Sequence, residues 1–108
     1  MPDLDSRPWT LGRWHTRPGK AADFRRAWSE FAAWMMEKRI GNVDAYLVQD
    51  EADPDLFFSF GRWQDAAAIA AWRALPEFGA FVGRVGDFCD AFEPHTVHLV
   101  AFFEEAGL

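Results

Sequence analysis

The chain has a single cysteine, so no disulfide bond can form within one molecule. Such cysteine usage is typical of proteins in a reducing compartment, and we expect a cytoplasmic protein. The one thiol, Cys89, stands among apolar residues at helical spacing, which predicts a buried, unreactive side chain in a helix.

Positive charge is also scarce. The chain has 11 Lys and Arg against 17 Asp and Glu, a formal net charge of −6, and its basic residues form no run or stripe. Nucleic acids and anionic membranes are bound by clustered Lys and Arg, so the sequence argues against both as partners. No apolar run approaches the roughly 18 residues of a membrane-spanning helix, and the first residues lack the apolar core of a signal peptide.

Aromatic residues, by contrast, are abundant, with six Trp and eleven Phe among 108 residues. A chain of this length predicts one domain, here over residues 9–104, after a flexible polar tail over residues 1–8. A core this small ordinarily needs fewer rings. Two interpretations are therefore open: a solid core built from rings, or a cavity that rings wall off for a flat apolar ligand.

The spacing of apolar residues predicts the order strand, helix, strand, strand, helix, strand. Strands are expected at 9–16, 43–50, 56–63 and 96–103, and helices at 20–39, in a short segment that Asp65 caps, and, beyond a break at Pro76, at 77–91 before a stop at Pro94. This order is the α+β, ferredoxin-like arrangement. It predicts a four-stranded antiparallel sheet with the first and third strands in the centre and helices on one face. The open sheet face carries enough apolar residues that we expect a second copy of the chain to cover it, which gives a homodimer.

Several motifs carry a resemblance to a known family. They are Arg17-Pro18-Gly19-Lys20 with Phe24 and Trp28, then Phe60-x-x-Trp63-x-Asp65, Ala71-Trp72 and Pro76-x-Phe78. Together they resemble the antibiotic biosynthesis monooxygenase family of dimeric α+β barrels. The resemblance implies a pocket for a small aromatic molecule between the sheet and the helices of each subunit. It also implies oxygenase chemistry in which a phenol or anthrone reduces dioxygen directly, without flavin, haem or metal, so we expect no cofactor.

The same resemblance suggests candidate catalytic residues. Trp63 matches a Trp beside the substrate of the anthrone-oxidising members, where its indole N–H would donate to a developing oxyanion. Ser59 lies on the same strand face, at the position where those members carry an Asn. Arg84 is the nearest match to an Arg of those members, with an offset of about two residues; the alternative is a surface ion pair with Asp87 at i, i+3.

His98 is a further candidate, because a neutral imidazole can take a phenolic proton. The alternative is a half-buried or solvent-facing His. The residues expected to bind the substrate are Trp14, Trp28, Trp72 and Phe81, and Gly12 leaves room for a ligand or for a neighbouring ring. Haem degradation is disfavoured because Val82 stands where the haem-degrading members have a His, and no metal site is expected because His95 and His98 point to opposite faces.

The sequence thus favours a cofactor-independent monooxygenase that oxidises a flat anthrone, phenol or quinol-like aromatic with dioxygen. The alternative is a non-catalytic dimer of the same fold that binds a small ligand or is purely structural. A cavity lined by Trp14, Ser59 and Trp63 favours the first, and a solid ring-packed core favours the second.

Overall fold

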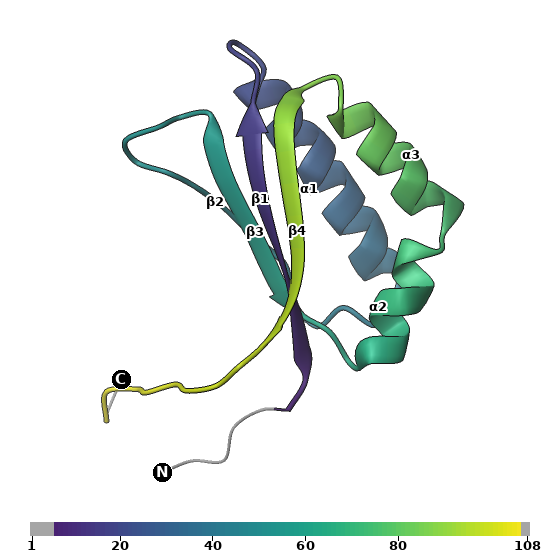
Figure 1. Ribbon diagram of the computed structural model, residues 1–108. Helices are drawn as coiled ribbons and strands as arrows, with labels where there is room; N and C mark the ends of the chain where they lie inside the picture. Colours follow the sequence, from purple (N-terminus) through teal and green to yellow (C-terminus); the bar gives the residue numbers. More distant parts are fainter. Residues whose placement is uncertain (1–5, 107–108) are drawn as a thin grey trace.

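The computed structural model describes residues 6–106, which fold in the order βαββαβ with the second helix in two pieces (Figure 1). The strands are β1 (Pro8–Thr16), β2 (Tyr46–Gln49), β3 (Leu56–Arg62) and β4 (Cys89–His98), and the helices are α1 (Ala21–Lys38), α2 (Ala66–Arg73) and α3 (Pro76–Val85). The predicted ferredoxin-like fold is confirmed. Of the tail expected over 1–8, residues 1–5 lie outside the described residues, and Pro8 already belongs to β1.

The strands form one antiparallel sheet in the order β2-β3-β1-β4, with β1 and β3 in the centre as predicted. Helices α1, α2 and α3 lie on one face of this sheet, and no helix within residues 6–106 covers the other face (Figure 1). Among the helices described, none is long and apolar enough to cross a membrane.

A side-chain cap and residues with positive φ set the ends of the helices. Asp65 caps α2, because its carboxylate accepts a hydrogen bond of 2.8 Å from the backbone N–H of Ala68. α1 ends at Lys38, and the chain turns through Arg39 and Gly41, which both have positive φ. The buried residues Phe24 and Met35 of α1 pack beneath the sheet.

The prediction for the last part of the chain was wrong. A helix was expected to continue to residue 91, but α3 ends at Val85 and β4 has already begun at Cys89. Cys89 therefore lies in a strand, although it is buried as predicted. Pro94 stands inside β4 instead of ending a helix. A proline is tolerated there because β4 is an edge strand. No further strand pairs with its outer side, so a missing backbone N–H costs no hydrogen bond between strands on that side.

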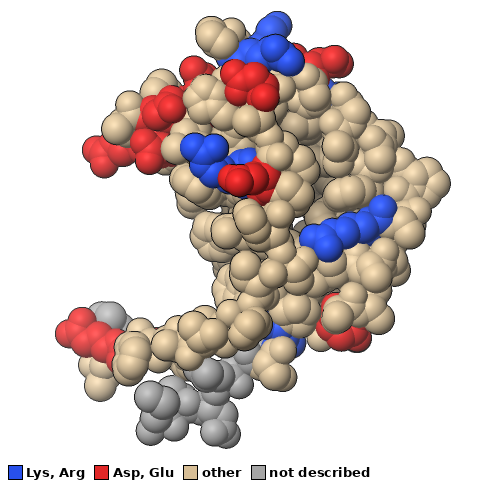
Figure 2. Space-filling model, viewed as in Figure 1, with Lys and Arg blue, Asp and Glu red and all other residues tan. Residues whose placement is uncertain are grey.

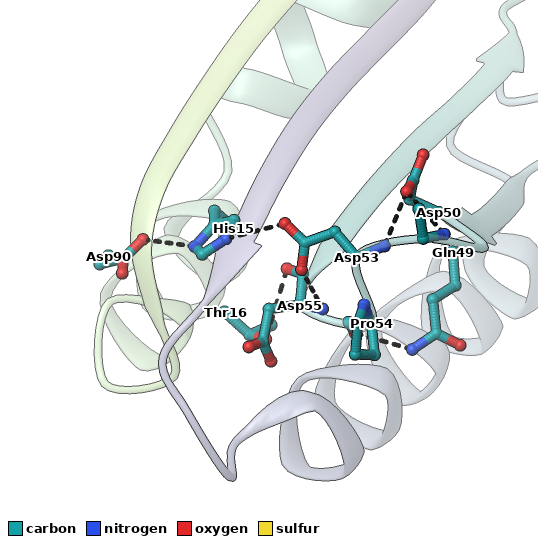
Figure 3. A network of polar contacts seen from close by, with 9 residues as sticks. His15, Thr16, Gln49, Asp50, Asp53, Pro54, Asp55 and Asp90 are labelled. Carbon is teal, nitrogen blue, oxygen red and sulfur yellow. Dashed lines mark hydrogen bonds and ion pairs between the residues drawn. The ribbon is translucent and has the colours of Figure 1, made fainter.

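Polar contacts close one end of the sheet (Figure 3). The fully buried Thr16 donates its hydroxyl hydrogen to the Asp55 carboxylate at 2.8 Å. The imidazole of His15 lies between two carboxylates, with Nδ1 3.0 Å from Asp90 and Nε2 3.4 Å from Asp53. The hydrogen bond to Asp90, with a smaller contribution from Asp53, raises the pKa of His15. These contacts join β1 to β4 and to the β2–β3 turn.

Candidate active site

A pocket with a volume of about 80 Å³ lies between the sheet and the helices. Strands β1 and β3 form its floor, and rings from all three helices and β4 form its walls. The large apolar residues of the lining are Leu11, Trp14, Trp28, Phe31, Met35, Phe60, Trp63, Trp72, Phe78, Phe81 and Phe92. Figure 2 shows a largely uncharged face that is hollowed between β4 and the helices. Pockets for drug-sized ligands usually exceed about 300 Å³, so a ligand of several rings requires the walls to move.

Ring contacts between different elements build the walls. Trp14 of β1 stacks on Phe92 of β4 at 3.9 Å between ring centroids, and Phe31 of α1 stacks on Phe81 of α3 at 4.2 Å. Such contacts add to the stability that burial provides. The structure brings together all four residues that the sequence suggested for substrate binding, Trp14, Trp28, Trp72 and Phe81. Their role in binding a substrate stays a prediction.

Trp63 lies on the pocket floor and is 1% exposed. Its indole N–H donates to the hydroxyl oxygen of Thr10 at 2.9 Å. An indole N–H can only donate, so Thr10 is the acceptor and its own hydroxyl proton stays available. Among the described residues this proton has no acceptor. A ligand oxygen on the floor would therefore meet the Thr10 hydroxyl, with Trp63 behind it.

A second pair of the same kind stands beside the first. The indole N–H of Trp14 donates to Ser59 Oγ at 2.9 Å, which leaves the Ser59 proton for another acceptor. The Trp14 ring leans over Gly12, where a Cβ atom would lie 2.8 Å from both Ser59 Oγ and Trp14 Nε1. A larger residue at this position would force Ser59 or the Trp14 ring to shift, and the space that glycine leaves is filled by a neighbouring ring. Gly12 faces Ser59, and Thr10 faces Gly61, in the β1–β3 register, so both hydroxyls point to the same side of the sheet.

Two buried polar atoms of the pocket residues have no hydrogen-bond partner among the residues that the structure describes. They are the side-chain oxygen of Asn42 and the indole nitrogen of Trp72. The amide nitrogen of Asn42 donates to the Asp44 carbonyl at 3.0 Å, so only its oxygen is unpaired. An unpaired buried group costs about 1–3 kcal/mol, and such groups are rare in folded proteins. A ligand or a water molecule that supplies the missing partners would remove this cost.

The lining includes two formally charged residues, Asp44 and Arg73. Arg62 binds the Asp44 carboxylate through its guanidinium, at 2.8 and 3.1 Å, and through its backbone N–H, at 2.7 Å. Burial opposes ionisation of Asp44, but these bonds outweigh it and lower its pKa. Arg73, the last residue of α2, donates to the hydroxyl oxygen of Thr96 on β4 at 2.9 Å.

Two of the predicted catalytic residues lie outside the pocket lining. Arg84 stands on the exposed side of α3 and forms an ion pair of 3.2 Å with Glu30 of α1. The surface ion pair was foreseen, but its partner is Glu30 and not Asp87. His98 is the exposed last residue of β4 and pairs with Pro8, beyond the end of the pocket. Trp63 and Ser59 are the two catalytic candidates that the structure brings together.

Thr10, Arg73 and Asn42 are polar lining residues that the sequence analysis missed. Strand alternation places Thr10 on the same face as Gly12 and Trp14, so a signal for it was present. Arg73 and Asn42 gave no comparable signal, because their positions depend on how α2 and the loop before β2 pack. His95 also borders the pocket, but it pairs with Leu11, so its side chain belongs to the open face. Within residues 6–106, no group of three or more His, Cys, Asp or Glu side chains is placed to hold a metal ion.

Several solved structures share this fold. A crystal structure of an Asn-to-Ala variant of SnoaB, a cofactor-independent oxygenase from Streptomyces nogalater, superimposes with a TM-score of 0.83 at 17% identity, over 94% of this chain and 100% of that one. A protein of Pseudomonas aeruginosa gives 0.76 at 19% identity, over 93% and 100%. A conserved protein of Methanosarcina mazei gives 0.75 at 14% identity, over 86% and 92%. At these identities the likeness shows the fold alone.

Sequence comparison gives the family. No curated protein matches the chain. The sequence profile described as antibiotic biosynthesis monooxygenase matches residues 10–84, which is more than half of the 108 residues. The matched range includes most of β1 and all of β3 and α2, and with them the polar floor of the pocket. The chain therefore belongs to the antibiotic biosynthesis monooxygenase family.

Proposed function

We propose that this protein is a cofactor-independent monooxygenase that oxidises a flat anthrone, phenol or quinol-like aromatic with dioxygen. The observation that carries the proposal is the pair of hydroxyls on the pocket floor, Thr10 and Ser59, each of which accepts from an indole and keeps a proton to donate. Apolar rings surround these donors. The family and the fold shared with SnoaB, a cofactor-independent oxygenase, support the same reaction class.

In this reaction the substrate supplies the electrons. Loss of a proton to solvent gives an electron-rich enolate or phenolate, which transfers one electron to dioxygen. The two radicals then combine, and a carbon–oxygen bond forms as a peroxide. For an anthrone, one oxygen atom stays as a new carbonyl, and the other leaves as water with the two hydrogens of the methylene group.

The protein binds and orients the anion in this scheme. The Thr10 and Ser59 hydroxyls donate to the oxygen on which negative charge develops, and the indoles of Trp63 and Trp14 hold each hydroxyl oxygen in place. Hydrogen bonds in series strengthen one another in a site of low dielectric constant. The ring walls align the flat substrate and exclude water.

Oxygen uptake tests this proposal. Purified, metal-free protein is mixed with dithranol or a simple quinol, and an oxygen electrode follows the reaction. We expect a rate well above that of buffer, with quinone formed in proportion to oxygen consumed. Thr10→Val and Ser59→Ala should each lower kcat about tenfold or more, because each removes a donor to the oxyanion. Ser29→Ala, on the exposed side of α1, is the matched control and should keep the full rate.

The alternative function is ligand binding without catalysis. The serine at position 59, where anthrone-oxidising relatives carry an Asn, and the small pocket volume favour it. Quenching of Trp fluorescence by an aromatic ligand, without any oxygen uptake across the substrate panel, would support this alternative and reject the monooxygenase.

We also propose that the protein forms a homodimer through the open sheet face. Tyr46 and Val48 of β2 and Val97 of β4 are 47%, 45% and 38% exposed there. Tyr46 stacks on Phe60 at 5.2 Å, so the patch continues across the strands. Beyond β4 the chain leaves the body as an arm with an exposed Phe103 (Figure 1). Sedimentation should give a dimer, which Val48→Asp converts to a monomer; a monomeric native protein would reject the interface.

A further inference from the structure

We propose that the mouth of the pocket binds an anionic group of the aromatic ligand, a carboxylate or an acidic phenolate, through Arg73. The inference rests on the proposed function, because it assumes that the pocket takes a flat aromatic, and it narrows the class of substrate to acidic aromatics. It places Arg73 of α2 in contact with the ligand, whereas the sequence suggested Arg84 of α3 as the arginine of the site.

The charges of the pocket support this assignment. Asp44 is the one carboxylate in the described lining, and Arg62 neutralises it through two guanidinium contacts. Arg73 has no carboxylate partner among the described residues, and its hydrogen bond goes to the neutral hydroxyl of Thr96. The pocket therefore keeps one uncompensated positive charge, on a chain whose net charge is −6. A ligand with a negative charge at the mouth would complete the pairing.

The geometry of the mouth fits a carboxylate. Arg73 ends α2, and its contact with Thr96 reaches across to β4, so the guanidinium stands between these two walls. A guanidinium presents five N–H donors in a planar fork that matches two carboxylate oxygens, and one of them goes to Thr96. The preceding residue, Trp72, also lines the pocket, and its buried indole N–H has no acceptor within residues 6–106. A cation without a carboxylate partner and a buried donor without an acceptor among the described residues thus adjoin at the same wall.

Arg84 is the natural control, because its charge is already paired. It contacts Glu30 at 3.2 Å on the exposed side of the helices and does not line the pocket. Both arginines are exposed in the last turn of a helix, so Arg→Gln at either position removes one positive charge from the protein. A difference between the two variants reports on the position of the charge and not on the net charge of the protein.

The test compares two ligands that cannot be oxidised further, anthraquinone-2-carboxylate and its carboxamide, by quenching of Trp fluorescence. We expect the native protein to bind the carboxylate about tenfold more tightly, which corresponds to about 1.4 kcal/mol and lies close to the range for hydrogen bonds to charged groups. Arg73→Gln should abolish this preference, Arg73→Lys should keep part of it, and Arg84→Gln should keep all of it. Added salt should reduce the preference of the native protein.

Equal affinity of the native protein for the two ligands, or no binding of either, would overturn the anion site. So would a loss of preference in Arg84→Gln as large as that in Arg73→Gln. Oxygen uptake separates this failure from failure of the proposed function. If neutral and acidic anthrones were oxidised with equal efficiency, the monooxygenase function would be supported and the anion site would be rejected. If the preference for the carboxylate depended on Arg73 but no oxygen uptake were seen, the anion site would be supported and the monooxygenase function would be rejected.

Discussion

The hydrogen bond from Trp63 to Thr10 makes a quantitative prediction about the pocket floor. Thr10→Val keeps the β-branched shape that suits a strand and removes only the hydroxyl. Because Trp63 is 1% exposed, its N–H could not turn to water and would stay buried without an acceptor. A buried donor left without a partner costs about 1–3 kcal/mol, so we expect the free energy of unfolding to fall by that amount.

A double-mutant cycle isolates the bond from the rest of the ring. Trp63→Phe removes the donor and also leaves a space, but the same space is present in the double variant and cancels in the cycle. Once the donor has gone, Thr10→Val leaves nothing unpaired and should cost little. The double variant should therefore be more stable than the sum of the single effects predicts, with a coupling energy of about 1–2 kcal/mol.

Urea unfolding followed by far-ultraviolet circular dichroism measures the four stabilities, with equal m-values as the check that the denatured states are comparable. Thr96→Val is the matched control, because this hydroxyl is exposed and accepts a hydrogen bond from Arg73 at the surface. It should change stability by less than about 0.5 kcal/mol. A coupling energy within about 0.5 kcal/mol of zero between Thr10 and Trp63 would refute the reasoning, because the two residues would then act independently.

Three other features lead to separate predictions. Gly79 and Gly83 of α3 have open space where a Cβ would stand and lack a positive φ, so each Gly→Ala variant should gain about 0.5–1 kcal/mol in a melting experiment, and a loss would reveal a hidden contact. The raised pKa of His15 means that its pairing with Asp90 contributes stability fully below the ordinary pKa of 6.5 and loses it as pH rises through the raised value. His15→Gln should thus be less stable than the native protein at about pH 5.5 and equal to it at about pH 9, and a deficit that grows with pH would contradict the pairing. Burial raises the pKa of Cys89 from 9.0 to about 11, so the native thiol should react with a disulfide reagent about a hundredfold more slowly than the unfolded chain, and equal rates would show that it is accessible.

Elements with a long apolar pattern could be predicted from the sequence, and elements with a short one could not. α1 and the β2–β3 hairpin have long or well-bounded patterns, and Asp65 is a clear cap, so these parts were foreseen. The segment after α3 has too few apolar residues to distinguish the helical period of 3.6 residues from the strand period of two. There Pro94 predicts the end of a helix, whereas the edge position of β4 accommodates it as a strand residue.

The site was predictable where a strand fixes the direction of the side chain. Ser59 and Trp63 are four residues apart in and just after β3, so alternation places them on one face, and both line the pocket. Strand alternation also places Thr10 on this face, and its hydrogen bond with the Trp63 indole identifies it as a site residue. Arg73 and Arg84 differ because the way that helices pack on a sheet decides which residue faces inward, and no local pattern in this chain specifies that packing.

The central claim is that the floor of this pocket binds the oxygen of a flat aromatic ligand through hydroxyls that indoles hold in place. A crystal structure with a bound anthraquinone tests it most directly. The account predicts that the ligand lies among the rings of the pocket with a carbonyl oxygen about 2.7–3.2 Å from Thr10 Oγ1 or Ser59 Oγ. A ligand that lies on the open sheet face, or in the pocket with its oxygens away from both hydroxyls, would contradict it.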